Sequence, residues 1–191
     1  DTNIYLPKIL YRKNYSWTEF INSSNQKNQK TYLFEEIGHT ICILYFLNGT
    51  DFHYENIIVN DTEGLVLIDC ESLLYPIVNS QINEHNVLSI GLLPEKIKIG
   101  NQHVDFSGLN FNANTTQESP IERETISIEN GEIATIEGKN ILFKSNNFQL
   151  DGSDNTNDYI DEILTGFKKS YLFLMENKNE LAAFFDTDSF D

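Results

Sequence analysis

Five polar residues of this chain have the side-chain chemistry of a phosphotransfer site and lie close together in the sequence: Asp51, His53, Asn56, Asp69 and Glu71. The first three lie in a polar stretch of sequence Thr-Asp-Phe-His-Tyr-Glu-Asn, and the last two follow a short apolar run. Transfer of a phosphoryl group from a nucleotide requires hard oxygen ligands for Mg²⁺ and a group that orients the attacking hydroxyl. The types and spacing of these residues therefore point to phosphoryl transfer.

The residue types suggest a role for each position. Asn56 and Asp69 suit a metal ion, because carboxamide and carboxylate oxygens are hard ligands. Asp51 could accept a hydrogen bond from the nucleophilic hydroxyl, while His53 could orient that aspartate, touch a phosphate oxygen or act in proton transfer. Glu71 is a further metal ligand or a group that supports the ligands. Kinase-like folds present their catalytic and metal-binding groups in this order.

Taken one at a time, these residues have a simpler explanation. Asp and Asn commonly stabilise turns, and His53 alone would be a satisfied loop histidine. Single motif matches are also often false. A helix directly before the polar stretch and a hairpin directly after it favour the catalytic interpretation over turn capping.

The elements around the polar stretch are predicted from apolar spacing. From Thr31, apolar residues recur every three or four positions, which predicts a helix. These residues are Leu33, Ile37, Ile41, Leu44 and Tyr45. Asn48-Gly49 is expected to end the helix with a left-handed cap. Two apolar runs, 57–59 and 65–68, flank a polar connection and predict a β-hairpin that leads to Asp69.

Patterns elsewhere are weaker. Residues 87–94 are expected to form a buried segment, and residues 110–120 a solvated loop. Alternation over residues 125–144, with turns expected at Asn130-Gly131 and Glu137-Gly138, predicts short antiparallel strands.

The two ends of the chain are assigned to an extended segment and a helix. Residues 4–20 are expected to be extended and then to form a packed turn, with Trp17 in the core rather than on a stacking platform. A polar loop over 146–157 precedes a helix predicted from Asp158 to about Asn177, whose apolar face is expected to pack into the core. The sequence contains no internal repeat, so we expect one α+β domain.

Composition excludes some classes of partner. The 191 residues contain 13 Lys and Arg against 29 Asp and Glu, a formal net charge of -16, which disfavours nucleic acid. Cys42 and Cys70 lie inside apolar runs without metal-ligand spacing, which indicates reduced thiols of a cytoplasmic protein. Neither a membrane-spanning run nor a signal peptide is predicted.

Other residues with possible chemistry are assigned to structure. His39, His85 and His103 are scattered without metal-ligand spacing, so each is expected to be structural. The glycines form neither a P-loop nor a GxGxxG motif. A nucleotide would therefore need a phosphate-covering element and a lysine from elsewhere, and its binding residues stay unassigned.

Three segments of the chain resemble the dehydratase domain of class II lanthipeptide synthetases, the LanM family. Residues 15–20 resemble the family's Y-x-W-x-E-F segment, residues 50–56 its T-D-x-H-x-E-N loop, and residues 67–73 its L-I-D-x-E-T-L strand end. Weaker landmarks follow in the expected order, at residues 92–94 and 105–109 and at Gly166, Phe167 and Tyr171. The resemblance covers most of the chain.

The resemblance implies a kinase-like fold that uses ATP and Mg²⁺ to phosphorylate Ser and Thr of a ribosomal precursor peptide. Elimination of phosphate would then leave dehydroalanine or dehydrobutyrine, as in lantibiotic biosynthesis. The peptide partner would carry a leader and a core rich in Ser, Thr and Cys, and a separate cyclase domain would add the cysteine thiols. Asp51, His53 and Asn56 would carry over as catalytic residues, and Asn56, Asp69 and Glu71 as metal ligands.

Departures from the family pattern predict that residues 1–191 are one partial domain. The family's nucleotide-contacting lysine lies in an upstream V-Y-K-P-R-like segment, which Lys8 and Lys13 do not match. Its elimination residues lie in an R-x-T segment that is expected downstream, as is the zinc-binding cyclase. The chain is thus expected to correspond mainly to the C-lobe of the kinase-like fold, with its catalytic loop and metal-binding hairpin. It is not expected to be fully active alone.

Two other functions are compatible with the core motif. A small-molecule phosphotransferase uses a similar D-x-x-x-x-N loop and strand-terminal Asp, although the Trp17 segment and the position of His53 favour the synthetase. A non-catalytic peptide-binding module would explain the absence of the nucleotide-contacting lysine and of the elimination residues. Truncation explains the same absences without loss of function.

Overall fold

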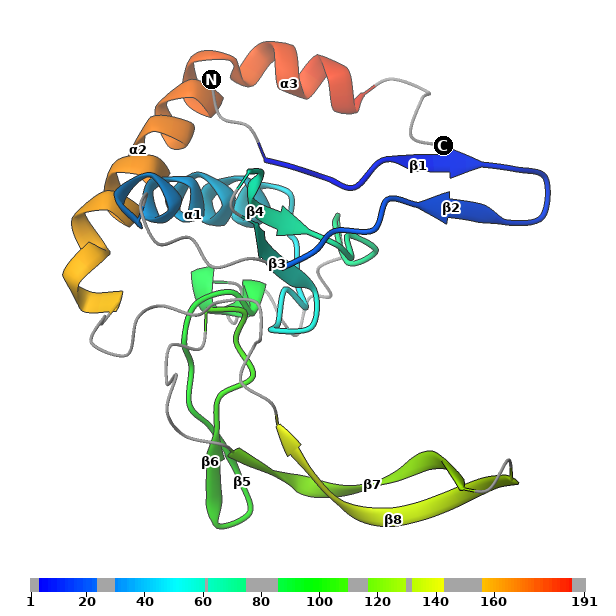
Figure 1. The fold of residues 1–191 in the computed structure, drawn as a ribbon. Helices are drawn as coiled ribbons and strands as arrows, with labels where there is room; N and C mark the ends of the chain where they lie inside the picture. The colour runs from blue at the N-terminus through cyan, green and yellow to red at the C-terminus, as the bar shows by residue number, and fades with distance from the viewer. Residues whose placement is uncertain are drawn as a thin grey trace.

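The computed structural model describes residues 4–23, 30–60, 62–74, 86–109, 117–129, 132–142 and 156–186 (Figure 1). In chain order, its elements are β1 (Ile9–Tyr11), β2 (Ser16–Thr18), α1 (Lys30–Phe46), β3 (Ile57–Asn60), β4 (Gly64–Leu67), the 3-10 helix η1 (Val87–Ile90), β5 (Ile97–Ile99), β6 (Gln102–Val104), β7 (Gln117–Glu129), β8 (Glu132–Leu142), the 3-10 helix η2 (Thr156–Tyr159), α2 (Ile160–Glu176) and α3 (Lys178–Phe185). Within these ranges the strands form four two-stranded antiparallel sheets, each made of strands consecutive in the sequence.

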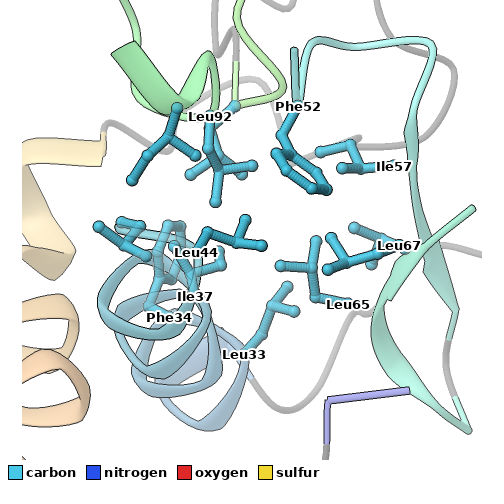
Figure 2. Packing of buried hydrophobic residues seen from close by; sticks show 13 residues of the cluster. Leu33, Phe34, Ile37, Leu44, Phe52, Ile57, Leu65, Leu67 and Leu92 are labelled. Carbon is cyan, nitrogen blue, oxygen red and sulfur yellow. The ribbon is translucent and has the colours of Figure 1, made fainter. Parts of the chain in front are cut away.

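Helix α1 and the β3–β4 hairpin form where the sequence predicts a helix and a hairpin, and they pack together. Asn48 adopts a left-handed conformation with φ of 48° in the turn that follows α1, so the predicted cap is confirmed, with Asn48 as its left-handed residue. The hairpin pairs Ile57 with Leu67 and Val59 with Leu65. Side chains of the helix and the hairpin face one another in a buried apolar cluster (Figure 2). Burial of this cluster fixes the ends of the polar stretch between the two elements.

Helices α1 and α2 lie side by side at unusually close range (Figure 1). A Cβ atom added to Gly38 would lie 2.0 Å from the Ile163 carbonyl oxygen, and one added to Gly166 would lie 1.9 Å from the Glu35 carbonyl oxygen. Only glycine therefore permits this approach of the two backbones at these positions. The contact gives a physical reason for Gly166, which the sequence marks only as a landmark of the resemblance.

Polar side chains also link the two helices. His39 Nδ1 lies 2.8 Å from Ser170 Oγ, and the Lys169 ammonium forms an ion pair with Glu35. Burial lowers the pKa of His39, which is consistent with the predicted structural role of this histidine. His103 lies in β6, and His85 lies outside the described residues.

The structure corrects the prediction that Trp17 is in the core. Trp17 lies on β2 and is 67% exposed, because among the described strands β1 and β2 pair only with each other, and they extend away from α1 and α2 (Figure 1). Its ring instead meets the edge of Tyr15, with the ring centroids 6.2 Å apart.

The predicted strands beyond residue 117 form one long hairpin. Glu129 pairs with Glu132, so the two strands meet across the expected Asn130-Gly131 connection, which itself lies outside the described residues. The turn expected at Glu137-Gly138 is wrong, because Gly138 pairs with Arg123 inside β8. The solvated loop expected over 110–120 overlaps β7, which already begins at Gln117; residues 110–116 are outside the described part.

The remaining expectations have mixed outcomes. Residues 87–94 form η1 and the segment that follows it. Ile90, the last residue of η1, and Leu92, just after it, are buried, as predicted. Of the loop expected over 146–157, only the last two residues are described, and they belong to η2. The apolar face predicted for α2 is confirmed only in part, because Ile163 and Phe167 pack against the core whereas Leu164 is 59% exposed.

Both cysteines are free thiols: Cys42 is buried, and Cys70 is half-buried. No helix in the part of the chain that the structure describes combines the length and apolar character needed to cross a membrane.

Glu36 connects α1 to the end of the hairpin turn. Its side chain is 6% exposed, and Oε2 accepts a hydrogen bond of 3.2 Å from the Leu65 amide. The Glu36 carboxylate also packs against Gly64, where an added Cβ atom would lie 2.1 Å from Oε2. Burial raises the pKa of this carboxyl from 4.5 to about 7. A buried acid thus holds the hairpin against the helix.

We expect Glu36→Gln to stabilise the protein at alkaline pH. Between pH 4.5 and about 7 the folded state binds more protons at Glu36 than the unfolded state does, so the free energy of unfolding falls as the pH rises. Above this window the ionised carboxylate costs on the order of 3 kcal/mol. Glutamine cannot ionise and still offers an oxygen to the Leu65 amide. Urea unfolding should therefore show the variant more stable than the wild type at pH 8 and equal to it near pH 4.

Glu35→Gln is the matched control on the same helix. The Lys169 hydrogen bond lowers the pKa of Glu35, so its carboxylate contributes stability above the unfolded pKa that is lost as the pH falls. This control should lower stability at pH 8. Equal responses of the two variants at pH 8 would contradict the burial of an ionisable Glu36.

Candidate functional site

The loop that follows α1 is anchored on both sides. Phe52 is fully buried, and its ring reaches into the core between Leu92 and Ile57 (Figure 2). The Phe52 amide donates to the Ile90 carbonyl at 2.9 Å, and the Tyr54 amide donates to the Phe106 carbonyl at 3.2 Å. Alternate residues of the loop are therefore held by the core and by the 86–109 segment, which leaves Asp51 and His53 at the surface between them.

Asp51 and Asn56 close the loop on itself. Asp51 has a φ of 65°, a left-handed conformation that Asp and Asn tolerate better than most residues. The Asn56 carboxamide Nδ2 donates a 2.8 Å hydrogen bond to the Asp51 backbone carbonyl. This bond explains the five-residue spacing, because it joins the two ends of one turn. The Asp51 side chain itself is 62% exposed.

His53 is oriented by its own loop. The Glu55 amide donates to His53 Nδ1 at 3.1 Å, so Nδ1 is the unprotonated nitrogen and the neutral ring carries its proton on Nε2. This assignment follows from the hydrogen-bond geometry. Nε2 lies 3.5 Å from Asp51 Oδ1 and also 3.5 Å from the Asn56 carboxamide Nδ2. The ring is therefore placed where it could orient the Asp51 carboxylate, which is one of the three roles that the sequence suggests for His53.

Asp69 emerges beside Asn56 at the open end of the β3–β4 hairpin. The Ile68 amide donates to the Asn56 carbonyl at 3.0 Å, so Asp69 is the next residue past this pairing. Asp69 Oδ1 accepts a 3.2 Å hydrogen bond from the Glu71 amide, and both acidic side chains are exposed.

A second link returns the chain to the start of the loop. The Ser72 hydroxyl donates to the Thr50 carbonyl, and the Thr50 amide donates to the Ser72 carbonyl at 3.3 Å. The structure thus brings both halves of the motif to one end of the hairpin. Sequence analysis assigned no role to Ser72, although this residue lies within the strand-end motif of the resemblance.

The donor set at this end of the hairpin matches the needs of Mg²⁺. Asn56 Oδ1 and the carboxylates of Asp69 and Glu71 are hard oxygen donors on neighbouring segments. Mg²⁺ in nucleotide sites is commonly bound through one or two carboxylates, with phosphate oxygens and water completing the shell. Among the described residues, no three His, Cys, Asp or Glu side chains cluster closely enough to hold a metal alone. These described donors therefore do not form a metal centre by themselves.

A cavity of about 450 Å³ is lined by Asp51 and His53, and Asn56, Asp69 and Glu71 do not line it. It is bounded by the loop, by η1 and by the segment from Leu93 to Ser107. Gly91 lines it with a φ of 82°, and an added Cβ atom there would lie 3.2 Å from the Phe52 amide nitrogen. A larger cavity of about 710 Å³ lies among α1, α2 and α3, and none of the five predicted site residues lines it.

Ser107 lines the smaller cavity and is held in place by Asp105. Asp105 is buried, and its Oδ1 accepts hydrogen bonds from the Ser107 amide at 2.9 Å and the Ser107 hydroxyl at 2.6 Å. Ser107 pairs with His53 through an antiparallel bridge. The sequence identified residues 105–109 as a landmark of the resemblance without a role. The contact between Ser107 and His53 joins residues more than fifty positions apart, so no local sequence pattern could have predicted it.

Comparison with known proteins identifies relatives of the whole chain. The family model described as a domain of unknown function, DUF4135, matches residues 1–188. The chain is also 26% identical over 208 residues to the lacticin 481/lactococcin biosynthesis protein LcnDR2 of Lactococcus lactis subsp. lactis. That match covers 98% of this chain and 22% of the relative, so the chain spans about a fifth of the relative's length. The chain belongs to the DUF4135 family, and its resemblance to the class II lanthipeptide synthetases is confirmed.

Proposed function

We propose that this chain is the phosphoryl-transfer part of a class II lanthipeptide synthetase dehydratase with a kinase-like fold. It phosphorylates Ser and Thr of a ribosomal precursor peptide with ATP and Mg²⁺ in the cytoplasm. One observation carries the proposal. The backbone hydrogen bond from Ile68 to Asn56 places Asp69 beside the loop that holds Asp51, His53 and Asn56. Similarity to a lacticin 481/lactococcin biosynthesis protein supports a peptide as the acceptor.

Asp51 and His53 act on the acceptor. The Asp51 carboxylate accepts the hydrogen bond of the Ser or Thr hydroxyl and takes its proton as the hydroxyl oxygen bonds to the γ-phosphorus. The bond between that phosphorus and the β,γ-bridging oxygen breaks, and ADP leaves. His53 Nε2–H, 3.5 Å from Asp51 Oδ1, keeps the carboxylate directed at the hydroxyl. Preorganisation of this kind accounts for much of phosphoryl-transfer catalysis.

Asn56, Asp69 and Glu71 hold the metal that accompanies the nucleotide. When bound, Mg²⁺ neutralises charge on the phosphates and orients them. The Asn56 carboxamide is fixed by its 2.8 Å hydrogen bond to Asp51, and Asp69 is fixed by the Glu71 amide. Elimination of the phosphate to give a dehydroamino acid belongs to the same proposal, as does a partner cyclase domain. No residue of this chain is assigned to either of these later steps.

Mass spectrometry of the precursor peptide tests the proposal. The full-length synthetase should be incubated with its precursor, ATP and Mg²⁺, with a parallel reaction that contains EDTA. We expect a mass gain of one phosphate or a loss of one water for each modified Ser or Thr, and neither with EDTA. If a folded, ATP-binding protein leaves the peptide unchanged but phosphorylates a small alcohol, the small-molecule phosphotransferase replaces this proposal. Peptide binding without ATP turnover would instead identify a binding module.

A further inference from the structure

The cavity beside Asp51 has an acidic end and an apolar wall. Asp51, Glu55 and Glu95 contribute carboxylates to its lining, and no Lys or Arg is among the described residues that line it. Three carboxylates without a cation repel the triphosphate of a nucleotide. Asp69 and Glu71 do not line this cavity. The nucleotide with its metal is therefore better accommodated on the hairpin side of the loop than in this cavity.

The rest of the cavity lining is largely apolar. Leu88, Leu93, Ile97 and Phe106 line the cavity together with the small residues Gly91 and Ser89. Leu88 is 38% exposed and Ile97 is 45% exposed, so their apolar surfaces can cover a ligand. Ligand sites of about 300–1,000 Å³ commonly combine such walls with a few polar groups. A volume of about 450 Å³ can receive a residue or two of a peptide.

Hydrogen bonds hold the wall at a fixed place relative to Asp51. Asp105 Oδ1 accepts from the Ser107 amide and hydroxyl and also from the Glu95 amide at 3.4 Å, so one buried carboxylate joins the two sides of the β5–β6 hairpin. The Gly108 amide donates to the Gly91 carbonyl at 2.9 Å, which ties this segment to η1. The wall and the catalytic loop therefore behave as one preformed surface.

We propose that this cavity is the acceptor subsite, which binds the precursor segment around the Ser or Thr that is phosphorylated. The inference rests on the function proposed above. An uncharged or basic segment of the peptide enters from the side of Leu88 and Ile97, its apolar side chain packs on this wall, and its hydroxyl meets Asp51. Nucleotide and metal then approach the same hydroxyl from the Asp69 side. Asp51 lines the cavity and its backbone carbonyl is bonded to Asn56, so the two proposed substrates can meet at this residue, as transfer between two bound substrates requires.

Ile97→Asp in the full-length synthetase tests the subsite, with Ile160→Asp as a matched control. Ile160 begins α2, is 44% exposed and does not line the cavity, so the two substitutions are alike in chemistry and exposure. We expect Ile97→Asp to lower kcat/KM for the precursor at least tenfold, because a carboxylate replaces an apolar contact. The Kd for ATP should stay unchanged. Leu88→Asp, on a different element, should act like Ile97→Asp, and Ile160→Asp should change neither constant.

Photocrosslinking provides a readout that does not depend on catalysis. A benzophenone amino acid placed at Ile97 should crosslink to the precursor without ATP, whereas one placed at Ile160 should not. The assignment is overturned if both positions crosslink equally, if neither does, or if Ile97→Asp weakens ATP binding and leaves the peptide constants unchanged. A different outcome separates this inference from the proposed function. If the benzophenone at Ile97 crosslinks selectively but the wild-type protein transfers no phosphate to the precursor, the proposed function is rejected and the peptide subsite is retained.

Discussion

Asp69→Asn is expected to lower peptide phosphorylation about a thousandfold at low Mg²⁺, because the stabilisation that a metal gives to phosphoryl transfer is worth several kcal/mol. The substitution removes one negative ligand from the open end of the hairpin. Asparagine keeps the shape of the side chain and can still accept the Glu71 amide hydrogen bond that Asp69 accepts at 3.2 Å. The loss should therefore arise from the metal and not from the fold. Initial rates measured over a series of Mg²⁺ concentrations would show it.

Recovery at high Mg²⁺ distinguishes a weakened metal site from other damage. We expect part of the lost activity of Asp69→Asn to return as Mg²⁺ is raised, whereas the wild type is already saturated. Asp161→Asn, the same change at an exposed position of α2, should leave the rate and its Mg²⁺ dependence unaltered. A Mg²⁺ dependence of Asp69→Asn that matches the wild type would show that Asp69 is not a metal ligand.

Asp51→Asn is expected to reduce kcat by about 10²–10⁴-fold, the usual contribution of a positioned general base. The Asn56 carboxamide binds the backbone carbonyl of residue 51, so this hydrogen bond survives the substitution. Asparagine also tolerates the left-handed conformation with φ of 65° at this position. The variant keeps the loop and loses only the carboxylate that accepts the hydroxyl proton. Single-turnover phosphorylation with saturating ATP and precursor measures this step directly.

Binding constants separate this variant from Asp69→Asn. We expect Asp51→Asn to bind ATP with its Mg²⁺ as the wild type does, and thermal unfolding should match that of Asp161→Asn. A variant with wild-type kcat would remove Asp51 from the mechanism and leave its carboxylate as a turn residue, which is the simpler explanation that the sequence allows.

The sequence predicts the elements whose geometry depends on nearby residues. Helical spacing from Leu33 onward, the Asn48 cap and the apolar runs beside residues 60–64 all reflect hydrogen bonds and packing within a few turns of chain. The predicted turn at Glu137-Gly138 was wrong because it relied on local residues alone. Pairing with Arg123 of the partner strand holds Gly138 in an extended strand, and nearby residues do not reveal that pairing. The kinase-like C-lobe remains a prediction, as do the roles of the five site residues.

The sequence by itself determined the order of helix, polar loop and hairpin, and with it the closeness of Asp51, His53 and Asn56. Only the tertiary structure decided that Ser107, held by the buried Asp105, lines a cavity against this loop, that Glu36 is buried beside the hairpin, and that Trp17 is exposed. The reason is physical: local conformation follows from neighbouring residues, whereas burial and pairing between distant segments depend on how the elements pack, which periodicity along the chain does not encode.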